Sequence, residues 1–172
     1  MSGRPQLDVR PAAERDVPQG RIEGVELARV TPYVDHRGSL TEVVDFDHPF
    51  WRESVVYAYC FTIVPGRIKG WGMHKRQTDR YFLVRGSVRT VLYDGRAESG
   101  TFGAYETHNL TAASSGLLRI PPGVWHASQN WGDSEAAIMN FPTRPFDRVD
   151  PDKYRIDPHS DEIPFDWSLP DG

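Results

Sequence analysis

Glycine and proline recur along the whole chain and restrict it to short elements of secondary structure. The 172 residues include 15 Gly and 14 Pro, which is too many breaks for long helices and suits many short strands. No stretch of the sequence keeps a helical hydrophobic period for more than a turn or two. Many short strands without intervening helices predict an all-β sandwich or antiparallel barrel.

Runs of β-branched and aromatic residues mark the expected strands, and each run ends at a turn signal such as Pro65-Gly66. We expect strands at residues 25–30, 39–44, 54–64, 80–85, 87–94, 117–120 and 136–141. A small barrel of such strands has a ligand cavity at one mouth, lined by every second residue.

The length of the chain fits a single domain with a core of its own. Residues 1–24 are polar and rich in proline, which predicts an N-terminal arm. Residues 25–147 form the expected β-barrel, and residues 148–172 form a polar tail. The apolar residues between Ile163 and Trp167 predict that this tail packs on the barrel.

Composition narrows the range of partners and compartments. The net charge of −4 argues against nucleic acid, whose phosphates need a basic surface. Cys60 is the only cysteine, so no intrachain disulfide is expected. No apolar run approaches the ~18 residues of a membrane span, and the first residues lack the apolar segment of a signal peptide. We therefore expect a soluble, cytoplasmic protein with no membrane partner.

Two histidines stand in recognisable contexts. The segment from Pro121 to Asn130 reads P-x-G-x-x-H-x-x-x-N and resembles the second signature of the cupin β-barrel. About fifty residues earlier, residues 69–75 resemble an incomplete first signature. The pair predicts that His74 and His126 point into one cavity. An imidazole there can act as a base or ligate a metal, because its pKa lies near neutrality.

The metal-binding pattern of cupins is incomplete. Metal-binding cupins typically present H-x-H, then a carboxylate, then the histidine of the second signature, and one histidine is missing here. At most His74, Asp79 and His126 remain as ligands. Arg76 and Arg80 follow closely in the sequence and would oppose a cation. We therefore expect neither a metal nor another cofactor.

Basic residues suggest an anion site near the expected mouth. Arg37 presents a fork of donors suited to phosphate, although a charged hairpin tip explains it equally well. A further basic group, which a solvated strand face would also explain, comprises Lys69, Arg76, Arg80, Arg85, Arg89 and Arg119.

Several blocks, taken in order, resemble one family. The blocks are Asp35-x-Arg37-Gly38-x-Leu40-x-Glu42, Lys69-Gly70-Trp71, the run from Tyr93 to Gly103, Ile120 to His126, and the tail motifs at 151–155 and 163–167. This order is similar to the dTDP-4-dehydrorhamnose 3,5-epimerase family of cupins (RmlC-like), over residues 25–167.

The resemblance implies a metal-free, jelly-roll cupin that forms a homodimer with an exchanged N-terminal strand. Its members bind a nucleoside-diphosphate 4-keto sugar. A histidine supported by an aspartate removes the proton next to the ketone, and a tyrosine returns a proton from the other face. A lysine or arginine stabilises the enolate.

The sequence departs from this family at two central positions. The expected catalytic histidine falls on Gly72, and the expected tyrosine falls near Asn140. Our hypothesis for the catalytic residues is therefore His74 as base, Asp157 as its partner and Lys69 as oxyanion stabiliser. The remaining candidates, for substrate binding, are Arg37, Glu42, Trp71, Arg119 and His126.

Three functional interpretations stay open. The first is an epimerase or isomerase of a nucleoside-diphosphate 4-keto sugar, without a metal. The second is a repurposed cupin enzyme that acts on another small metabolite, for example in natural-product tailoring, with or without a metal. The third is a cupin that binds a sugar nucleotide without chemistry.

Overall fold

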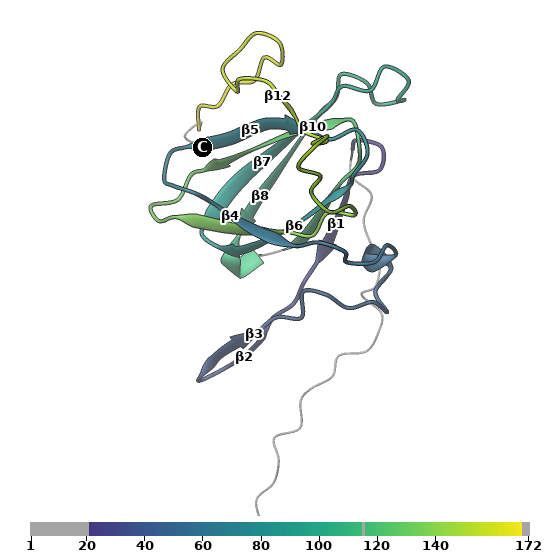
Figure 1. Ribbon diagram of the computed structural model, residues 1–172. Helices are drawn as coiled ribbons and strands as arrows, with labels where there is room; N and C mark the ends of the chain where they lie inside the picture. The colour runs from purple at the N-terminus through teal and green to yellow at the C-terminus, as the bar shows by residue number, and fades with distance from the viewer. Residues whose placement is uncertain (1–20, 115, 170–172) are drawn as a thin grey trace, which may run out of the picture.

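The computed structural model describes residues 21–114 and 116–169, and its main body is two facing antiparallel sheets (Figure 1). The first sheet has the order β1 (Glu26–Arg29), β9 (Gly116–Ile120), β6 (Asp79–Arg85), β11 (Ala136–Asn140) and β4 (Tyr59–Ile63). The second has the order β12 (Tyr154–Arg155), β5 (Ile68–Met73), β10 (Val124–Asn130), β7 (Ser87–Asp94) and β8 (Tyr105–Thr111). A separate hairpin joins β2 (Tyr33–Asp35) to β3 (Gly38–Leu40).

The predicted all-β, jelly-roll fold is confirmed, and the only helical turns in residues 21–114 and 116–169 are the short 3-10 segments Pro49–Trp51 and Ala112–Ser114. The expected strand at 54–64 begins only at Tyr59. Its first carbonyls bind a side chain instead, because the guanidinium of Arg80 donates to the carbonyl oxygens of Glu53 and Ser54 at 2.7 and 3.1 Å. The strand expected at 39–44 ends at Leu40.

The main core lies between the two sheets and is apolar. Leu83, Leu92, Leu118 and Ile138 are at most 2% exposed there. Ile22 belongs to the same core at 0% exposure, and its backbone N–H donates to Glu106 at 2.9 Å. Barrel packing therefore begins before the boundary predicted at residue 25, whereas residues 1–20 of the expected arm lie outside the described residues.

Both outer faces are also covered, which removes the simple alternation of buried and exposed residues in the central strands. Phe50 and Trp51 pack with Phe82 on the outside of the first sheet. The tail covers the outside of the second sheet, where Trp167 packs against Trp71 with ring centres 5.4 Å apart. Residues 79–83 and 88–92 are therefore buried without a break, and the buried residues include the charged side chains of Asp79, Arg80 and Arg89.

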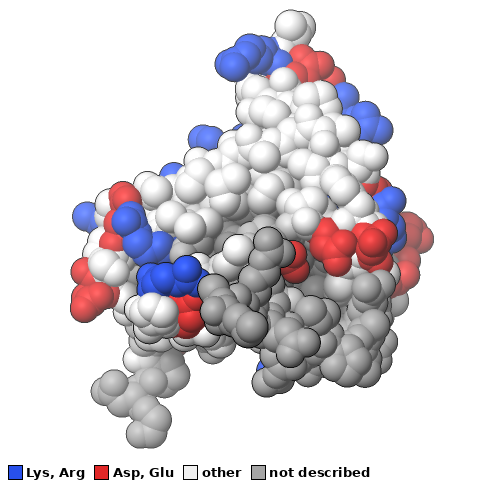
Figure 2. Space-filling model, turned by 90° about the horizontal axis from the view of Figure 1, so that it is seen from below, with Lys and Arg blue, Asp and Glu red and all other residues white. Residues whose placement is uncertain are grey.

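The β2–β3 hairpin projects away from the barrel (Figure 1). It leaves Tyr33, Val34 and Leu40 exposed at 41%, 74% and 60%. Seen from below the view of Figure 1, much of the described surface carries few charged side chains, which gather at its margins (Figure 2). A two-stranded hairpin is marginally stable alone in water, so a partner surface is expected to stabilise it.

None of the helices in the described part of the chain is long and apolar enough to cross a membrane.

The turn between β6 and β7 depends on Gly86, which has φ +90° and stands against β11. A Cβ at this position would lie 2.7 Å from the Cα of Ala136, whereas a Cβ at Gly66, with φ +70°, would meet no atom within 4 Å. We expect Gly66→Ala to lower the free energy of unfolding by about 1–2 kcal/mol, the cost of a left-handed backbone. Gly86→Ala should cost a further ~1–3 kcal/mol because the core cannot accommodate the methyl group.

Urea denaturation of both variants beside the wild type measures this difference. Equal losses of stability in the two variants would contradict the close approach of β11 to the turn.

Candidate functional site

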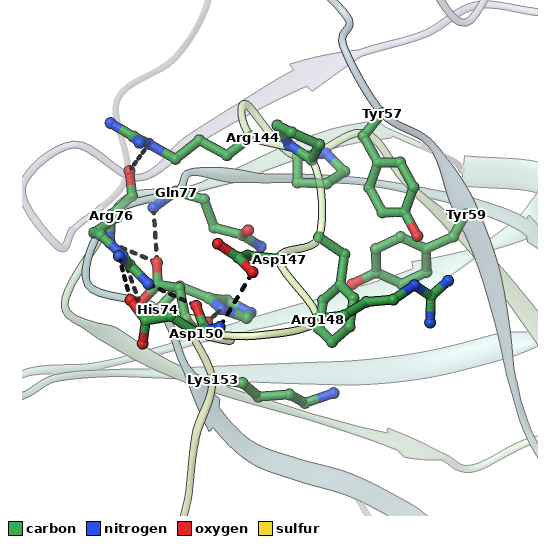
Figure 3. Close-up of a pocket in the computed structure, with 14 residues that line it drawn as sticks. Tyr57, Tyr59, His74, Arg76, Gln77, Arg144, Asp147, Arg148, Asp150 and Lys153 are labelled. Atoms are coloured by element: carbon green, nitrogen blue, oxygen red, sulfur yellow. Dashed lines mark hydrogen bonds and ion pairs between the residues drawn. The ribbon is translucent and has the colours of Figure 1, made fainter.

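A cavity of about 710 Å³ opens beside the ends of β4 and β5. Its size suits a small-molecule ligand. Figure 3 shows Tyr57 and Tyr59 on one side, with His74 and Arg76 on the other. The segment between β11 and β12 closes the site, because residues 142–153 contribute much of the lining.

His74 follows β5 and is held in one orientation. Its Nδ1 contacts the backbone carbonyl of Asp152. A carbonyl oxygen only accepts, so Nδ1 carries the hydrogen and Nε2 has a free lone pair. The carboxylate of Asp152 fixes the same loop by accepting from the backbone N–H groups of Lys75 and Arg76 at 2.9 and 2.7 Å.

Asp79 is the carboxylate beside His74. It is the first residue of β6, with 1% of its side chain exposed. Its Oδ1 accepts from the amides of Gln77 and Asn140 at 2.8 and 2.9 Å. Its Oδ2 lies 3.4 Å from Nε2 of His74 and 3.5 Å from Nε2 of His126.

His126 lies on β10, behind His74 as seen from the cavity, with the two rings stacked at 5.8 Å between centroids. Its Nδ1 is 3.2 Å from the carbonyl oxygen of Val124. Burial lowers the pKa of His126, although the charge of Asp79 opposes that shift. A Cβ at Gly72 would stand 3.4 Å from Nε2 of His126, so the glycine leaves the space beside this nitrogen open.

Tyr59 supplies a phenol that the sequence analysis missed. Tyr59 on β4 is the direct strand partner of Asn140 on β11, and the amide of Asn140 donates to its hydroxyl at 2.9 Å. Burial and the charge of Asp79 raise the pKa of Tyr59 to about 12, which keeps the hydroxyl protonated. A phenol therefore stands one strand away from the position where the sequence comparison expected a tyrosine.

Of Lys153 and Lys69, only Lys153 borders the site. Lys153 lines the cavity, and burial lowers its pKa together with the charges of Arg155 and Lys69, against the opposing charge of Asp79. Lys69 is exposed on β5, with its Nζ 5.5 Å from the ring centre of Phe61. Lys153 was missed because nothing local in the polar tail distinguishes it from a solvated lysine.

Asp157 is not the partner of His74, because its Oδ1 accepts from the backbone N–H of His159 at 2.8 Å on an exposed part of the tail. The pairing predicted from the sequence is corrected to Asp79, which β6 brings to the ring of His74.

Trp71 and Arg119 also lie away from the cavity, in contrast to their predicted role in substrate binding. Trp71 is 0% exposed beneath the tail on the outer face of the second sheet. Arg119 lies on the first sheet and pairs with Glu53 through bonds of 2.8 and 2.5 Å. These positions were misjudged because the face that each side chain occupies depends on the sheet pairing.

Arg37 and Glu42 belong to the projecting hairpin and the segment that follows it. Both are exposed, and neither lines the cavity of its own chain. Arg37 instead forms an exposed ion pair with Asp35 at 2.5 Å.

The family described as "Polysaccharide biosynthesis C-terminal domain" matches residues 33–154. The chain belongs to this family. It is 31% identical over 148 residues to the probable low-salt glycan biosynthesis epimerase Agl13 of Haloferax volcanii, covering 86% of this chain and 95% of that protein.

Solved structures of similar fold include sugar isomerases and epimerases. A dTDP sugar isomerase from Desulfovibrio desulfuricans has a TM-score of 0.80 at 28% identity, covering 87% of this chain and 94% of the other. A dTDP-4-dehydrorhamnose 3,5-epimerase from Bacillus anthracis has a TM-score of 0.78 at 19% identity, covering 91% of each chain, and shows the shared fold. The resemblance predicted from the sequence is confirmed, and the protein is an RmlC-like cupin.

The buried imidazole of His126 predicts a dependence of stability on pH. Its pKa in the folded protein is below the value of about 6.5 that it has when unfolded. The unfolded chain therefore binds more protons below about pH 6.5, and the free energy of unfolding should fall as the pH is lowered through this range. His126→Gln should remove this part of the pH dependence.

Chemical denaturation of both proteins from pH 8 to pH 5 measures the effect. If the difference in stability between the wild type and the variant stayed constant across this range, His126 would titrate as an ordinary histidine.

Proposed function

We propose that this protein is an epimerase or isomerase of a nucleoside-diphosphate 4-keto sugar, which works by removing the proton next to the ketone without a metal. The observation that carries the proposal is the position of His74 and Tyr59 on opposite sides of one cavity. Inversion at carbon needs a base on one face and an acid on the other. The names of the relatives, a glycan biosynthesis epimerase and a dTDP sugar isomerase, favour the same chemistry.

His74 is the proposed base. Its Nδ1–H is directed to the carbonyl of Asp152, which leaves the lone pair of Nε2 for the substrate proton. As the C–H bond breaks, its electron pair moves into the ketone and forms an enolate. The carboxylate of Asp79, 3.4 Å from Nε2, stabilises the imidazolium that results.

Tyr59 is the proposed acid. Its raised pKa keeps the phenol protonated, and the amide of Asn140 orients its oxygen. Transfer of the phenolic proton to the opposite face of the carbon restores the ketone with inverted configuration. This places the acid on β4 and gives Asn140 a supporting part in place of the tyrosine that relatives are expected to have there.

Cations around the cavity suit the rest of the substrate. Lys153, which lines the cavity, is the proposed stabiliser of the enolate oxygen, because a nearby ammonium group lowers the energy of that charge. Lys69 on β5 is the second candidate, although it does not line the cavity in this structure. Arg144 and Arg148 line the outer part of the cavity, where they are placed to bind a diphosphate. His126 supports His74 from behind.

The alternative of a binding protein without chemistry rests on Gly72, which takes the place of the histidine expected from the family. A repurposed enzyme for another metabolite is the remaining alternative. Transfer of deuterium from solvent into a 4-keto sugar separates both from the proposal.

We expect the wild type to incorporate deuterium from D2O next to the ketone of a dTDP-4-keto-6-deoxy sugar. His74→Gln should reduce this exchange by about 100-fold or more, the usual contribution of a general base. Tyr59→Phe should retain exchange but lose inversion, since it keeps the base and lacks the proton donor. NMR of the sugar measures both quantities, and exchange that survives in His74→Gln would contradict the assignment of the base.

We also propose that the active form is a homodimer in which the β2–β3 hairpin of one copy reaches the cavity of the other. The hairpin carries exposed apolar side chains and lies away from its own barrel. Arg37 and Glu42, the proposed nucleotide contacts, are on or next to this hairpin. Exchange of this hairpin between two copies would bring Arg37 and Glu42 to the cavity of the partner copy without any change in the barrel.

Mixed dimers test whether the hairpin of one copy completes the cavity of the other. Arg37→Ala and His74→Gln should each be inactive alone, but a mixed dimer has one cavity with an intact His74 and a partner hairpin with an intact Arg37. Random association then restores about a quarter of the active sites. Co-expression of the two variants with different tags, followed by the deuterium-exchange assay, measures how much activity is recovered. No recovery of activity in isolated mixed dimers would show that the hairpin acts within its own chain.

A further inference from the structure

Three electron-pair donors converge at the inner end of the cavity when both histidines are neutral. Nδ1 of His74 and Nδ1 of His126 each face a backbone carbonyl, so each Nε2 presents a lone pair. Oδ1 of Asp79 is occupied by two amide donors, while its Oδ2 is buried and accepts no hydrogen bond from the described residues. A buried acceptor without a donor costs free energy, and a cation between the three atoms would remove that cost.

We propose that Nε2 of His74, Nε2 of His126 and Oδ2 of Asp79 bind one divalent first-row transition-metal ion. These three atoms lie within 4.8 Å of one another. Two imidazoles and one carboxylate form a donor set that suits Zn²⁺, Co²⁺, Ni²⁺ and Fe²⁺ better than Mg²⁺ or Ca²⁺, which prefer oxygen ligands alone. The site goes beyond the proposed function, which uses no metal.

The spacing of the ligand atoms fits a single ion. Bonds of about 2.1 Å at a tetrahedral angle place two ligand atoms about 3.4 Å apart. Oδ2 of Asp79 is 3.4 Å from one imidazole nitrogen and 3.5 Å from the other. Two of the three ligand–ligand distances therefore already match a single ion, and the two imidazole nitrogens, which lie within 4.8 Å of each other, close to about the same spacing when it binds.

The surrounding hydrogen bonds are those of an oriented metal site. Ligating histidines typically donate their other N–H to a carbonyl or carboxylate, as both histidines do here. The amides of Gln77 and Asn140 hold the carboxylate with one oxygen free. Gly72 leaves space beside Nε2 of His126, and His74 borders the cavity, so a further position of the ion remains open to a small ligand.

Arg76 and Arg80, which the sequence predicts to oppose a bound cation, are paired with other groups. Arg76 pairs with Asp150 at 2.9 Å. Arg80 lies on the outer face of the first sheet, where its guanidinium donates to carbonyl oxygens and stacks on Trp51 at 4.8 Å. Lys153 is the cation whose charge acts on His126, and it is expected to weaken rather than prevent binding of the ion.

A bound ion would occupy the lone pair that the proposed base needs. In one molecule, metal binding and proton transfer by His74 therefore exclude each other. Binding should also weaken as the pH falls, because protons compete for the same nitrogen atoms.

The test uses full-length protein without a polyhistidine tag, stripped with a chelator. Zn²⁺ affinity is measured by competition with a chromophoric chelator, and Co²⁺ binding by its visible absorption spectrum. The wild type and the exposed control variant His159→Ala should bind one ion per chain. Asp79→Asn, which keeps the shape of the side chain, and His74→Gln should each weaken binding by about 100-fold or more.

Circular dichroism establishes that each variant is folded, and His74→Gln carries the test if Asp79→Asn is not. The proposal is overturned if the wild type binds no ion or binds it no more tightly than the folded variants. Deuterium exchange by the stripped protein, measured in parallel, separates the two hypotheses. Exchange without metal binding would overturn the metal site alone, whereas one tightly bound ion without exchange in the stripped protein would overturn the proposed metal-free epimerase.

Discussion

The carboxylate of Asp79 is the interaction on which the site depends. It is buried at the start of β6, where amides from Gln77 and β11 hold one oxygen and the histidines of β5 and β10 face the other. It thus links both sheets of the barrel. Burying a charge costs several kcal/mol unless it is compensated, and here the two amides that donate to Oδ1 supply part of that compensation.

The family fold is preserved, while two positions expected to carry catalytic groups hold Gly72 and Asn140 instead. Gly72 stands where relatives are expected to have the catalytic histidine, and the space beside His126 is open as a result. Asn140 stands where a tyrosine was expected, and its direct strand partner Tyr59 provides a phenol. His74 lies two residues along the chain from Gly72, and Tyr59 lies one strand across from Asn140, so an imidazole and a phenol still stand on different sides of the cavity.

Local patterns allowed the fold to be predicted from the sequence. The segment from Pro121 to Asn130 encodes a turn followed by a strand. The side-chain amide of Asn130, the last residue of this strand, donates to the backbone carbonyl oxygens of Ile63 and Ser134. The predicted proximity of His74 and His126 holds because their signatures lie on paired strands, although only His74 lines the cavity.

The rest of the site depends on long-range pairing that no local pattern encodes. The sequence predicts Asp157 as the partner of His74, but the start of β6 brings Asp79 there instead. Tyr59 became visible only through its register with β11, and Lys153 only through the path of the tail. Trp71 and Arg119 were assigned to the cavity, although each points to an outer face that other segments cover.

The most direct test of the central claim is a crystal structure with a dTDP-linked 4-keto sugar or a stable analogue. The account predicts that the sugar lies in the cavity, with the carbon next to its C4 position between Nε2 of His74 and the hydroxyl of Tyr59. A sugar bound elsewhere, or one whose reacting carbon faces neither residue, would contradict it.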